Sequence, residues 1–209
     1  MKDCPLFRGL SSEELAYAKD FFSARKKSYR KGEFINVITD KLPFFGYVLS
    51  GGVRVCMDEF DGTRVVMASV GPGESFGESL HFLQKETPVY IYASADTELL
   101  LLNASRVKER SDRPLDALLS ERFASMLAER TLHMNDRIQI LTKKSVRDKI
   151  VTYLSQQKNL WGKAEFDIPQ NRNELAEYLA VNRSALSREL ARMKEAGIID
   201  FQGNHFKLL

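Results

Sequence analysis

The chain has 209 residues, of which 44% are hydrophobic and 28% are charged. Domains usually contain about 100–200 residues, so this length predicts one large domain or two modest ones. The apolar fraction is sufficient for a folded core and excludes a disordered chain. No apolar run reaches the roughly 18 residues of a membrane helix, and the N-terminus has no apolar signal segment. We therefore expect a cytoplasmic protein without membrane contact.

Cysteine and histidine are too sparse to predict a metal centre or a disulfide framework. The two cysteines, Cys4 and Cys56, are 52 positions apart, and neither belongs to a CxxC pair. An iron–sulfur cluster held by four thiolates of one chain is excluded. The three histidines, His81, His133 and His205, are too scattered to suggest a metal site. We expect two reduced thiols, no metal ligands and no identified cofactor.

The net charge of +3 conceals an uneven distribution along the chain. Residues 1–141 carry 19 basic and 20 acidic side chains, whereas residues 142–209 carry 12 basic and 8 acidic ones. A basic C-terminal third suits a phosphate-rich partner. The excess alone does not identify nucleic acid, because solvated protein surfaces commonly carry such a charge.

The first half of the chain predicts one short helix followed by many strands. Residues 11–23 begin with Ser11 as a potential cap and two acidic residues in the first turn, which favours a helix. From residue 28 to about residue 102, short runs of β-branched and aromatic residues alternate with turn signals. These signals are Lys31-Gly32-Glu33, Ser50-Gly51-Gly52, Asp61-Gly62 and Gly71-Pro72-Gly73. Short strands at regular spacing predict a β-sandwich or a β-roll.

A long helix is predicted over residues 114–141, where no glycine or further proline follows Pro114. Its apolar residues advance by threes, fours and their multiples: Leu115, Leu119, Phe123, Met126, Met134, Ile138 and Leu141. A helix of roughly 27 residues is about 40 Å long, which exceeds what a small β domain needs as a cover. We therefore expect this stripe to pair with a second copy in a homodimer. The alternative is a helix that lies back on its own β domain.

Residues 142–209 predict short helices and a hairpin. A capping box from Asn171 to Glu174 opens one helix, and a break near residues 180–182 separates it from a second helix that Gly197 ends. Residues 198–208 are typical of a closing hairpin. Two short helices, a tight turn and a hairpin together predict a winged helix-turn-helix.

The second short helix, expected from Asn182 to Ala196, has two chemically different faces. Leu186, Leu190 and Met193 cluster on one side, and Ser184, Ser187, Arg188 and Ala191 lie nearly opposite. Small residues let a helix enter a DNA major groove, where Arg188 can bond O6 and N7 of a guanine. For any single arginine, the alternative is an ordinary solvated side chain.

Further candidate DNA contacts lie near the starts of the two short helices. Arg183 can contact a phosphate or a base, and Arg172 and Asn173 open the preceding helix, whose N–H groups favour phosphate. The predicted DNA-binding residues are Arg172, Asn173, Arg183, Ser184, Ser187 and Arg188.

The order of β-roll, long helix and winged helix-turn-helix resembles the cyclic-AMP receptor protein/fumarate-nitrate regulator family of bacterial transcription factors. The residues that carry the resemblance are Lys31-Gly32-Glu33, residues 47–55 around Gly51-Gly52, residues 71–78 and residues 173–188. The resemblance implies an α+β protein with a cyclic-nucleotide-binding-like β-roll at residues 1–113. A dimerisation helix at residues 114–141 and a DNA-binding winged helix-turn-helix at residues 142–209 would follow.

The resemblance also implies a function. A homodimer would bind a double-stranded DNA operator, act with RNA polymerase and respond to an effector through the β-roll. The helix of residues 182–196 would be the recognition helix, and Arg188 matches its guanine-reading arginine. Two positions depart from the family. Ser184 stands where many members have a glutamate that accepts a bond from cytosine, and Ala180 stands where the turn usually has glycine.

The β-roll departs further from the pattern of cyclic-nucleotide binders. Those members follow their Gly-Glu pair with an arginine that neutralises the cyclic phosphate, but residues 85–90 contain only Lys85 as a cation. Burying a phosphate without a matched cation is costly, so cyclic AMP is not the expected effector, although Lys85 could act as a mobile point charge. The resemblance leaves Gly77, Glu78 and Asn135 as candidate contacts for an unknown effector.

Other interpretations of these residues remain open. Glu78 can equally be a structural carboxylate, and His81 is expected in a partly exposed loop rather than as a haem ligand. A cupin-like metalloenzyme needs clustered histidines, whereas these lie on separate predicted elements. No GxSxG, phosphate loop or HExxH motif occurs, so we expect no catalytic residues and no enzyme. A ligand-binding module that does not act on DNA is the second alternative, and the winged helix-turn-helix argues against it.

Overall fold

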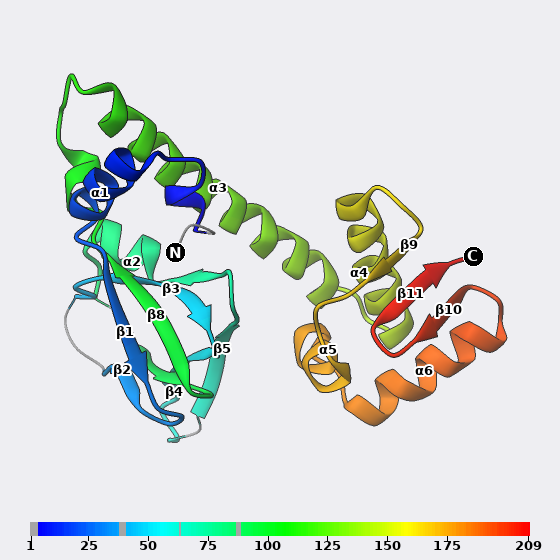
Figure 1. Cartoon of the computed structure of the whole chain (residues 1–209). Helices are drawn as coiled ribbons and strands as arrows, with labels where there is room; N and C mark the ends of the chain where they lie inside the picture. Colours follow the sequence, from blue (N-terminus) through cyan, green and yellow to red (C-terminus); the bar gives the residue numbers. More distant parts are fainter. Residues whose placement is uncertain (1–3, 38–40, 63, 87–88) are drawn as a thin grey trace. The chain divides into compact units, whose positions relative to one another are not determined.

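The computed structural model describes residues 4–37, 41–62, 64–86 and 89–209, without the side chain of Arg64. The chain divides into two units, Met1–Ala128 and Glu129–Leu209. The boundary lies within the long helix α3 (Pro114–Leu141), so this helix belongs partly to each unit (Figure 1). In the described parts of the chain, no helix combines the length and hydrophobicity that membrane crossing requires.

Two four-stranded antiparallel sheets lie in the first unit, as the predicted β-roll requires (Figure 1). The first sheet has the order β1-β8-β3-β6, and the second has the order β2-β7-β4-β5. The strands of the first sheet are β1 (Arg25–Tyr29), β8 (Thr97–Leu102), β3 (Phe45–Ser50) and β6 (Ser75–Phe76). Those of the second are β2 (Phe34–Asn36), β7 (Val89–Ala93), β4 (Val53–Asp58) and β5 (Arg64–Val70).

The first sheet is apolar on both of its faces. On strand β8, Leu99 contributes to a core shared with the second sheet, together with Ile91 and Val53. Its neighbour Leu100 contributes to a different core, which the helices cover. Because successive strand residues point to opposite faces, burial on both sides requires a continuous apolar strand. This explains why residues 99–102 are four consecutive leucines.

Helices cover the outer face of this first sheet. They are α1 (Ser12–Phe21), the 3-10 turns η1 (Pro5–Phe7) and η2 (Ser105–Lys108), and the first half of α3. Ser11 caps α1, as the sequence predicts, and the structure adds a capping box with Glu14. The short helix α2 (Glu78–Leu83) follows strand β6. This arrangement places the motif of residues 71–78 between strand β5 and the start of helix α2.

The apolar stripe of α3 is not one dimer face, which corrects the sequence prediction. Its first members pack into the core of their own unit, where Leu119, Phe123 and Met126 are buried and Leu115 is partly buried. Met134 and Ile138 remain 58% and 54% exposed. The first group is already buried within its own unit, whereas Met134 and Ile138 are open to a partner, so the stripe does not serve as one dimer face. The open alternative, a helix lying back on its own β domain, therefore applies to the first half of α3.

The second unit is the predicted winged helix-turn-helix. Its helices are α4 (Val146–Trp161), α5 (Arg172–Leu179) and α6 (Arg183–Glu195). Its strands are β9 (Glu165–Asp167), β10 (Ile199–Gln202) and β11 (His205–Leu208), in the sheet order β10-β11-β9. Residues from all three helices and the sheet share one core with Ile140, near the end of α3. The wing therefore has three strands rather than the hairpin alone, because β9 adds an edge.

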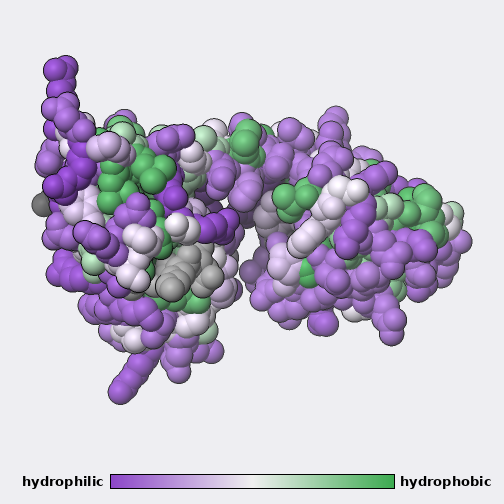
Figure 2. Space-filling view, turned by 45° about the horizontal axis from the view of Figure 1, so that its top comes forward, coloured by the Kyte–Doolittle hydropathy of each residue, from purple (hydrophilic) through white to green (hydrophobic). Residues whose placement is uncertain are grey.

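The face of the molecule in Figure 2 is mainly hydrophilic, and hydrophobic residues appear there in separate groups. Scattered exposed apolar side chains are normal on soluble proteins. Charged and polar residues therefore cover most of this face, which is consistent with the 28% of charged residues in the sequence.

Candidate nucleic-acid interface

Two short helices and a tight turn build the candidate interface. Asn171 caps α5 through bonds from the backbone N–H groups of Asn173 and Glu174, and the Glu174 carboxylate completes a capping box. Helix α5 ends at Ala180, whose φ of 49° and ψ of 57° are left-handed. Lys149 Nζ donates to the carbonyl oxygens of Leu179 and Ala180 at 3.0 and 3.2 Å. The turn is thus held from α4 despite its unusual backbone.

Helix α6 presents the two faces that its sequence predicts. Leu186, Leu190 and Met193 are buried, and they anchor the helix in the core of the second unit. On the opposite side, Ser184, Ser187, Arg188 and Ala191 are exposed. The ion pairs of Glu189 with Arg147 at 2.9 Å and with Arg192 at 3.6 Å lie along the edge of the helix. The exposed face is therefore small and polar at Ser184, Ser187 and Ala191, with the long cations Arg188 and Arg192 beside them.

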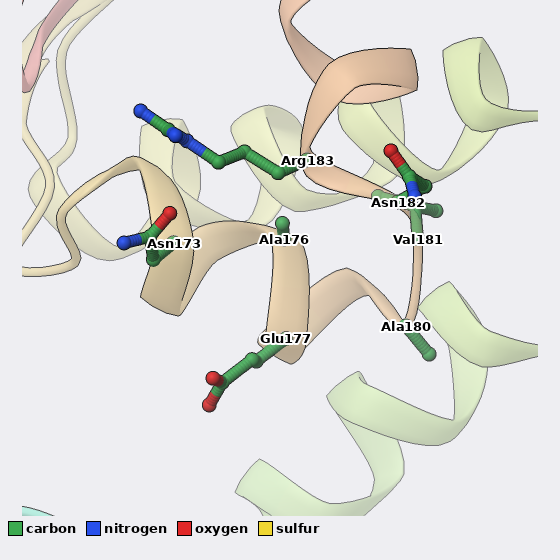
Figure 3. A pocket seen from close by; sticks show the side chains of 7 residues that line it. All are labelled: Asn173, Ala176, Glu177, Ala180, Val181, Asn182 and Arg183. Atoms are coloured by element: carbon green, nitrogen blue, oxygen red, sulfur yellow. The ribbon is translucent and has the colours of Figure 1, made fainter.

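A groove of about 510 Å³ lies where α5, the turn and the start of α6 meet. Its lining residues are Asn173, Ala176, Glu177, Ala180, Val181, Asn182 and Arg183. Figure 3 shows the Arg183 side chain extending over Ala176 in the direction of Asn173, with Glu177 pointing away from it. Ala176, whose small side chain is buried, lines the groove near the start of the Arg183 side chain. The sequence analysis did not select Asn182 as a site residue, although an asparagine directly before a predicted helix is a favoured N-cap.

The predicted arginines differ in how the fold uses them. Within the described residues, Arg183 and Arg188 make no hydrogen bond or ion pair, and both are exposed. Arg172 instead donates to the carbonyl oxygen of Gly203 at 3.0 Å and lies over the rings of Phe201 and Phe206. Burial lowers the pKa of Arg172 from its usual value. Arg172 thus ties the start of α5 to the wing.

Ser184 takes part in the cap of α6. The Oδ1 atom of Asn182 accepts the Ser184 backbone N–H at 2.9 Å and the Ser184 hydroxyl at 2.6 Å. Asn173, by contrast, has an exposed side chain at the start of α5. The predicted residues Asn173 and Arg183 both line the groove, while Ser184, Ser187 and Arg188 continue along the exposed face of α6.

The wing carries a cluster of titratable side chains. His205 lies between two carboxylates, with Nε2 at 3.1 Å from Glu165 and Nδ1 at 3.1 Å from Asp167. Lys207 lies 3.6 Å from Glu165. The bond to Glu165 and then the bond to Asp167 raise the pKa of His205. The same bond from His205, with the charge of Lys207, lowers the pKa of Glu165.

Two of the three candidate effector residues, Gly77 and Glu78, have structural roles in the first unit. Gly77 has a φ of 80°, and a Cβ atom built on it would lie 2.3 Å from a Leu42 methyl carbon. Glu78 is buried, and its carboxylate accepts a hydrogen bond from the Ser75 hydroxyl. Asn135 is exposed on α3, in the other unit. Thr87 and Pro88, in the segment that lacks an arginine, lie outside the described residues.

His81 differs from its sequence prediction, because it is a buried helix residue and not a partly exposed loop residue. It lies on α2 and is 2% exposed. Its Nδ1 lies 2.9 Å from the carbonyl oxygen of Leu42, and its Nε2 accepts the Ala104 N–H at 3.0 Å. A carbonyl accepts only from N–H, so the neutral imidazole donates from Nδ1. Both nitrogens are thus occupied, which leaves no ring nitrogen for a haem iron.

The described residues contain no group of three or more His, Cys, Asp or Glu side chains that could hold a metal ion. The histidines lie on three different elements, α2, α3 and β11. Both cysteines are buried, and burial raises the pKa of the Cys4 thiol to about 11. A thiol with that pKa is protonated at neutral pH, which suits a packed core residue rather than a ligand.

Two family models match the chain in the order in which its units occur. The model of the cyclic nucleotide-binding domain matches residues 26–113. The model of the Crp-like helix-turn-helix domain matches residues 148–209. The first match covers the β-roll, and the second covers α5, α6 and the wing.

Similar proteins of known function match along nearly the whole chain. The cyclic AMP receptor protein of Thermus thermophilus is 29% identical and covers 95% of this chain and 89% of its own length. The transcriptional activator protein FnrL of Cereibacter sphaeroides is 25% identical and covers 96% of this chain and 84% of its own length. The crystal structure of the Thermus thermophilus catabolite activator protein has a TM-score of 0.50 and 27% identity, over 98% of this chain and 93% of that one. The chain belongs to the Crp/Fnr family of DNA-binding transcription regulators.

Proposed function

We propose that this regulator reads a double-stranded DNA operator through the exposed face of α6, with Arg188 bonding a guanine. The observation that carries the proposal is that Arg183 and Arg188 are exposed and have no hydrogen-bond or ion-pair partner in the described residues. An uncommitted guanidinium beside small residues can reach O6 and N7 of a guanine bidentately. Ser184 and Ser187 would contact neighbouring bases or phosphates.

The start of α5 is the proposed phosphate contact. Asn173 is exposed beside the groove, and backbone N–H groups at a helix start favour anions. Arg172 would contribute mainly by holding the wing, because its guanidinium already bonds Gly203 and lies over two phenylalanine rings. The basic excess of residues 142–209 supports binding to a polyanion.

A second copy of the chain is the proposed partner of α3. A heptad repeat lies on the side of α3 that the first unit does not fully cover. Its a positions are Ala117, Ala124, Thr131 and Ile138, and its d positions are Ser120, Leu127, Met134 and Leu141. Six of these eight are exposed, and Ser120 and Leu127 are half-buried. A repeat of this kind over four heptads favours a two-stranded coiled coil. This seam replaces the stripe predicted from sequence.

The homodimer would place two α6 helices on one operator. Family geometry spaces two half-sites about 34–36 Å apart, one turn of DNA. An effector would shift the dimer between two arrangements of its long helices. Residues 1–113 would bind the effector, residues 114–141 would transmit the change, and residues 142–209 would bind the DNA.

The effector itself is unknown, and cyclic AMP is not the proposed one. Gly77, Glu78 and Asn135 remain the candidate effector contacts. RNA polymerase is a proposed partner, the cytoplasm the proposed location, and no catalytic activity is proposed.

Unbiased selection of operators from random duplex DNA tests the proposed reading of DNA. The purified protein is used alone and with a protein-free bacterial extract, which supplies small-molecule effectors. We expect enrichment of an inverted repeat with a guanine in each half-site. Binding to that operator in gel shifts should weaken steeply as salt rises, because counterions are released from phosphates. Enrichment of no sequence under either condition contradicts the proposal.

The dimer has its own test. Ile138→Glu places two like charges in the seam and removes two apolar contacts, worth about 1.5–3 kcal/mol each, so dissociation should increase at least about 100-fold. Gln139→Glu adds the same charge at the neighbouring position, outside the seam, and should leave the dimer intact. Sedimentation equilibrium measures both variants. A wild-type protein with the mass of one chain, even when DNA is present, contradicts the homodimer.

A further inference from the structure

A histidine between two carboxylates occupies the outer face of the wing. His205 lies opposite Asp167 in the register of β11 and β9, with its Nδ1 atom 3.1 Å from that carboxylate. Its Nε2 atom lies 3.1 Å from Glu165, which is also 3.6 Å from Lys207. A neutral imidazole has one N–H and one lone pair, whereas the protonated ring has two N–H groups. Because ionised carboxylates only accept, the protonated ring alone matches both neighbours.

The charge of this face depends on His205. Strand β10 adds the uncharged Gln202 opposite His205, and it adds Asp200 opposite Lys207. Asp200 forms an ion pair with Lys194 of α6, so that pair contributes no net charge. The two carboxylates of β9 are balanced by Lys207 and a protonated ring. When the ring loses its proton, these four groups carry a net charge of −1.

The same cluster lies beside the proposed phosphate contact at the start of α5. Arg172, the first residue of α5, donates to the carbonyl oxygen of Gly203 at 3.0 Å. The N–H of Ile168 donates to the carbonyl oxygen of Asn204 at 2.9 Å, which holds the other side of the same turn. His205 follows this turn directly, and its Cα atom lies at most about 8 Å from that of Gly203. Charges interact over about this distance at physiological ionic strength.

We propose that His205 makes operator affinity depend on pH, because the protonated ring neutralises the wing beside the DNA backbone and the neutral ring leaves a negative charge that repels phosphates. This role rests on the proposed function, since it requires the start of α5 to meet DNA. It gives the second unit an input of its own, the proton, that does not pass through the β-roll.

The direction of the effect follows from the two carboxylates. Their hydrogen bonds raise the pKa of His205 above its ordinary value of about 6.5. Operator affinity is therefore highest below that value and falls as pH rises through the raised pKa. A unit charge about 10 Å away in water changes binding roughly two-fold. Two wings on one operator should give about a four-fold change at low salt.

Fluorescence anisotropy with the selected operator, from about pH 6 to pH 9 at about 10 mM salt, tests the proposal. The affinity of wild-type protein should fall about 2–4-fold more over this range than that of His205→Gln, which cannot take the proton. His133→Gln is the matched control, because His133 is an exposed histidine of the same unit, on α3 and outside the seam. It should follow the wild-type profile.

Glu165→Gln separates the charge of the cluster from its part in folding. Glutamine keeps the shape of the side chain and an oxygen that accepts from the ring, but it removes the negative charge. The pKa of His205 should fall, so the loss of affinity should move to lower pH. Raising salt to about 150 mM shortens the range of charge from about 30 Å to 8 Å and should shrink the wild-type effect. Circular dichroism checks that each variant is folded.

Wild-type protein provides a test that needs no substitution. If protonation of His205 favours DNA, then DNA must favour protonation of His205 by the same factor. An NMR titration of the His205 ring should therefore show a pKa that is higher by about 0.2–0.3 with operator bound, which corresponds to roughly two-fold per wing. The His133 ring, followed in the same spectra, should show a smaller change.

The outcomes distinguish this inference from the proposed function. Failure of wild-type protein to bind any duplex at any of these pH values overturns both. Operator binding with the same pH profile in wild-type and His205→Gln protein overturns the role of His205 only. A pKa of His205 that DNA leaves unchanged or lowers overturns it as well. An affinity loss that stays at the same pH in Glu165→Gln overturns the part assigned to the carboxylates.

Discussion

The candidate residues of the two units differ in how far the fold itself uses them. In the first unit, Gly77 provides a left-handed backbone against Leu42, and Glu78 is buried with a bond from Ser75. In the second unit, the exposed Arg183 and Arg188 have no polar partner within the described chain. Side chains of the first kind are required for folding with or without a ligand. Side chains of the second kind lose conformational freedom only when a partner binds them.

This difference decides what each motif can indicate. A Gly-Glu pair at the end of a β-roll strand indicates the roll, because the turn needs the glycine and the buried serine hydroxyl needs an acceptor. It does not by itself indicate the ligand of the roll. An arginine that stabilises nothing within the chain points instead to an external partner. The function of the second unit is therefore better defined than the effector of the first.

The largest effect is expected where a candidate site residue is also structural. Gly77→Ala adds a methyl group to a left-handed residue and directs it at Leu42, so the first unit should lose roughly 2–5 kcal/mol of stability. Gly32→Ala is the matched control, because Gly32 has a φ of 84° and open space at its Cβ position. It should lose only about 1–2 kcal/mol. Denaturant unfolding without added ligand measures both, and equal losses would contradict the packing role of Gly77.

The next effect is expected where a residue has no role in folding. Arg188→Ala should leave the unfolding midpoint unchanged and reduce the preference for operator over random DNA by about 1–3 kcal/mol, or roughly 5–150-fold. Arg8→Ala, an exposed arginine in the other unit, removes the same charge and should preserve the preference. Competition gel shifts at fixed salt measure both variants. Full preference in the Arg188 variant would show that the assigned readout is wrong.

Helix caps and turns were predicted well from the sequence, because they depend on residues that are close together along the chain. Ser11, Asn171 and Gly197 mark helix ends that the structure confirms. The two faces of α6 followed from helical spacing alone, since Leu186 and Arg188 are separated by about 200°. These features require no knowledge of distant parts of the chain.

Features that depend on distant residues could not be predicted in the same way. The stripe of α3 was interpreted as one face because each step looked helical, but the direction drifts along 28 residues and Phe123 meets the first unit's core. His81 read as a loop residue because its partners, Leu42 and Ala104, are 39 and 23 positions away. The Ser184–Asn182 bond is local, yet which atom donates emerges only from side-chain geometry.

A smaller effect is expected at Ala180, where the fold imposes a backbone that alanine disfavours. The left-handed conformation costs an L-residue about 1–2 kcal/mol, and glycine gives up roughly 0.5–1 kcal/mol in chain entropy. Ala180→Gly should therefore stabilise the second unit by up to about 1 kcal/mol. Ala191→Gly, on the exposed face of α6, should instead destabilise it by about 1 kcal/mol. Thermal unfolding compares the two, and destabilisation by both would contradict the strain at Ala180.

The smallest effect concerns the wing, where His205 bonds Glu165 and Asp167 on the surface. Because the folded pKa of His205 is raised, its contribution to stability is complete below the unfolded pKa of about 6.5 and is lost as pH rises through the folded pKa. Glu165 behaves oppositely, because its lowered pKa gives a contribution that is lost as pH falls through the folded value. The cluster is therefore most stabilising between these two titrations, with Glu165 ionised and His205 protonated.

The free energies of unfolding of wild-type and His205→Gln protein, measured from about pH 4 to pH 9, test this arrangement. The difference between the two proteins should narrow toward alkaline pH. A stability difference that widens toward alkaline pH would reverse the assignment. High salt should shrink the difference, because Glu165 and Asp167 are exposed and His205 is half-exposed.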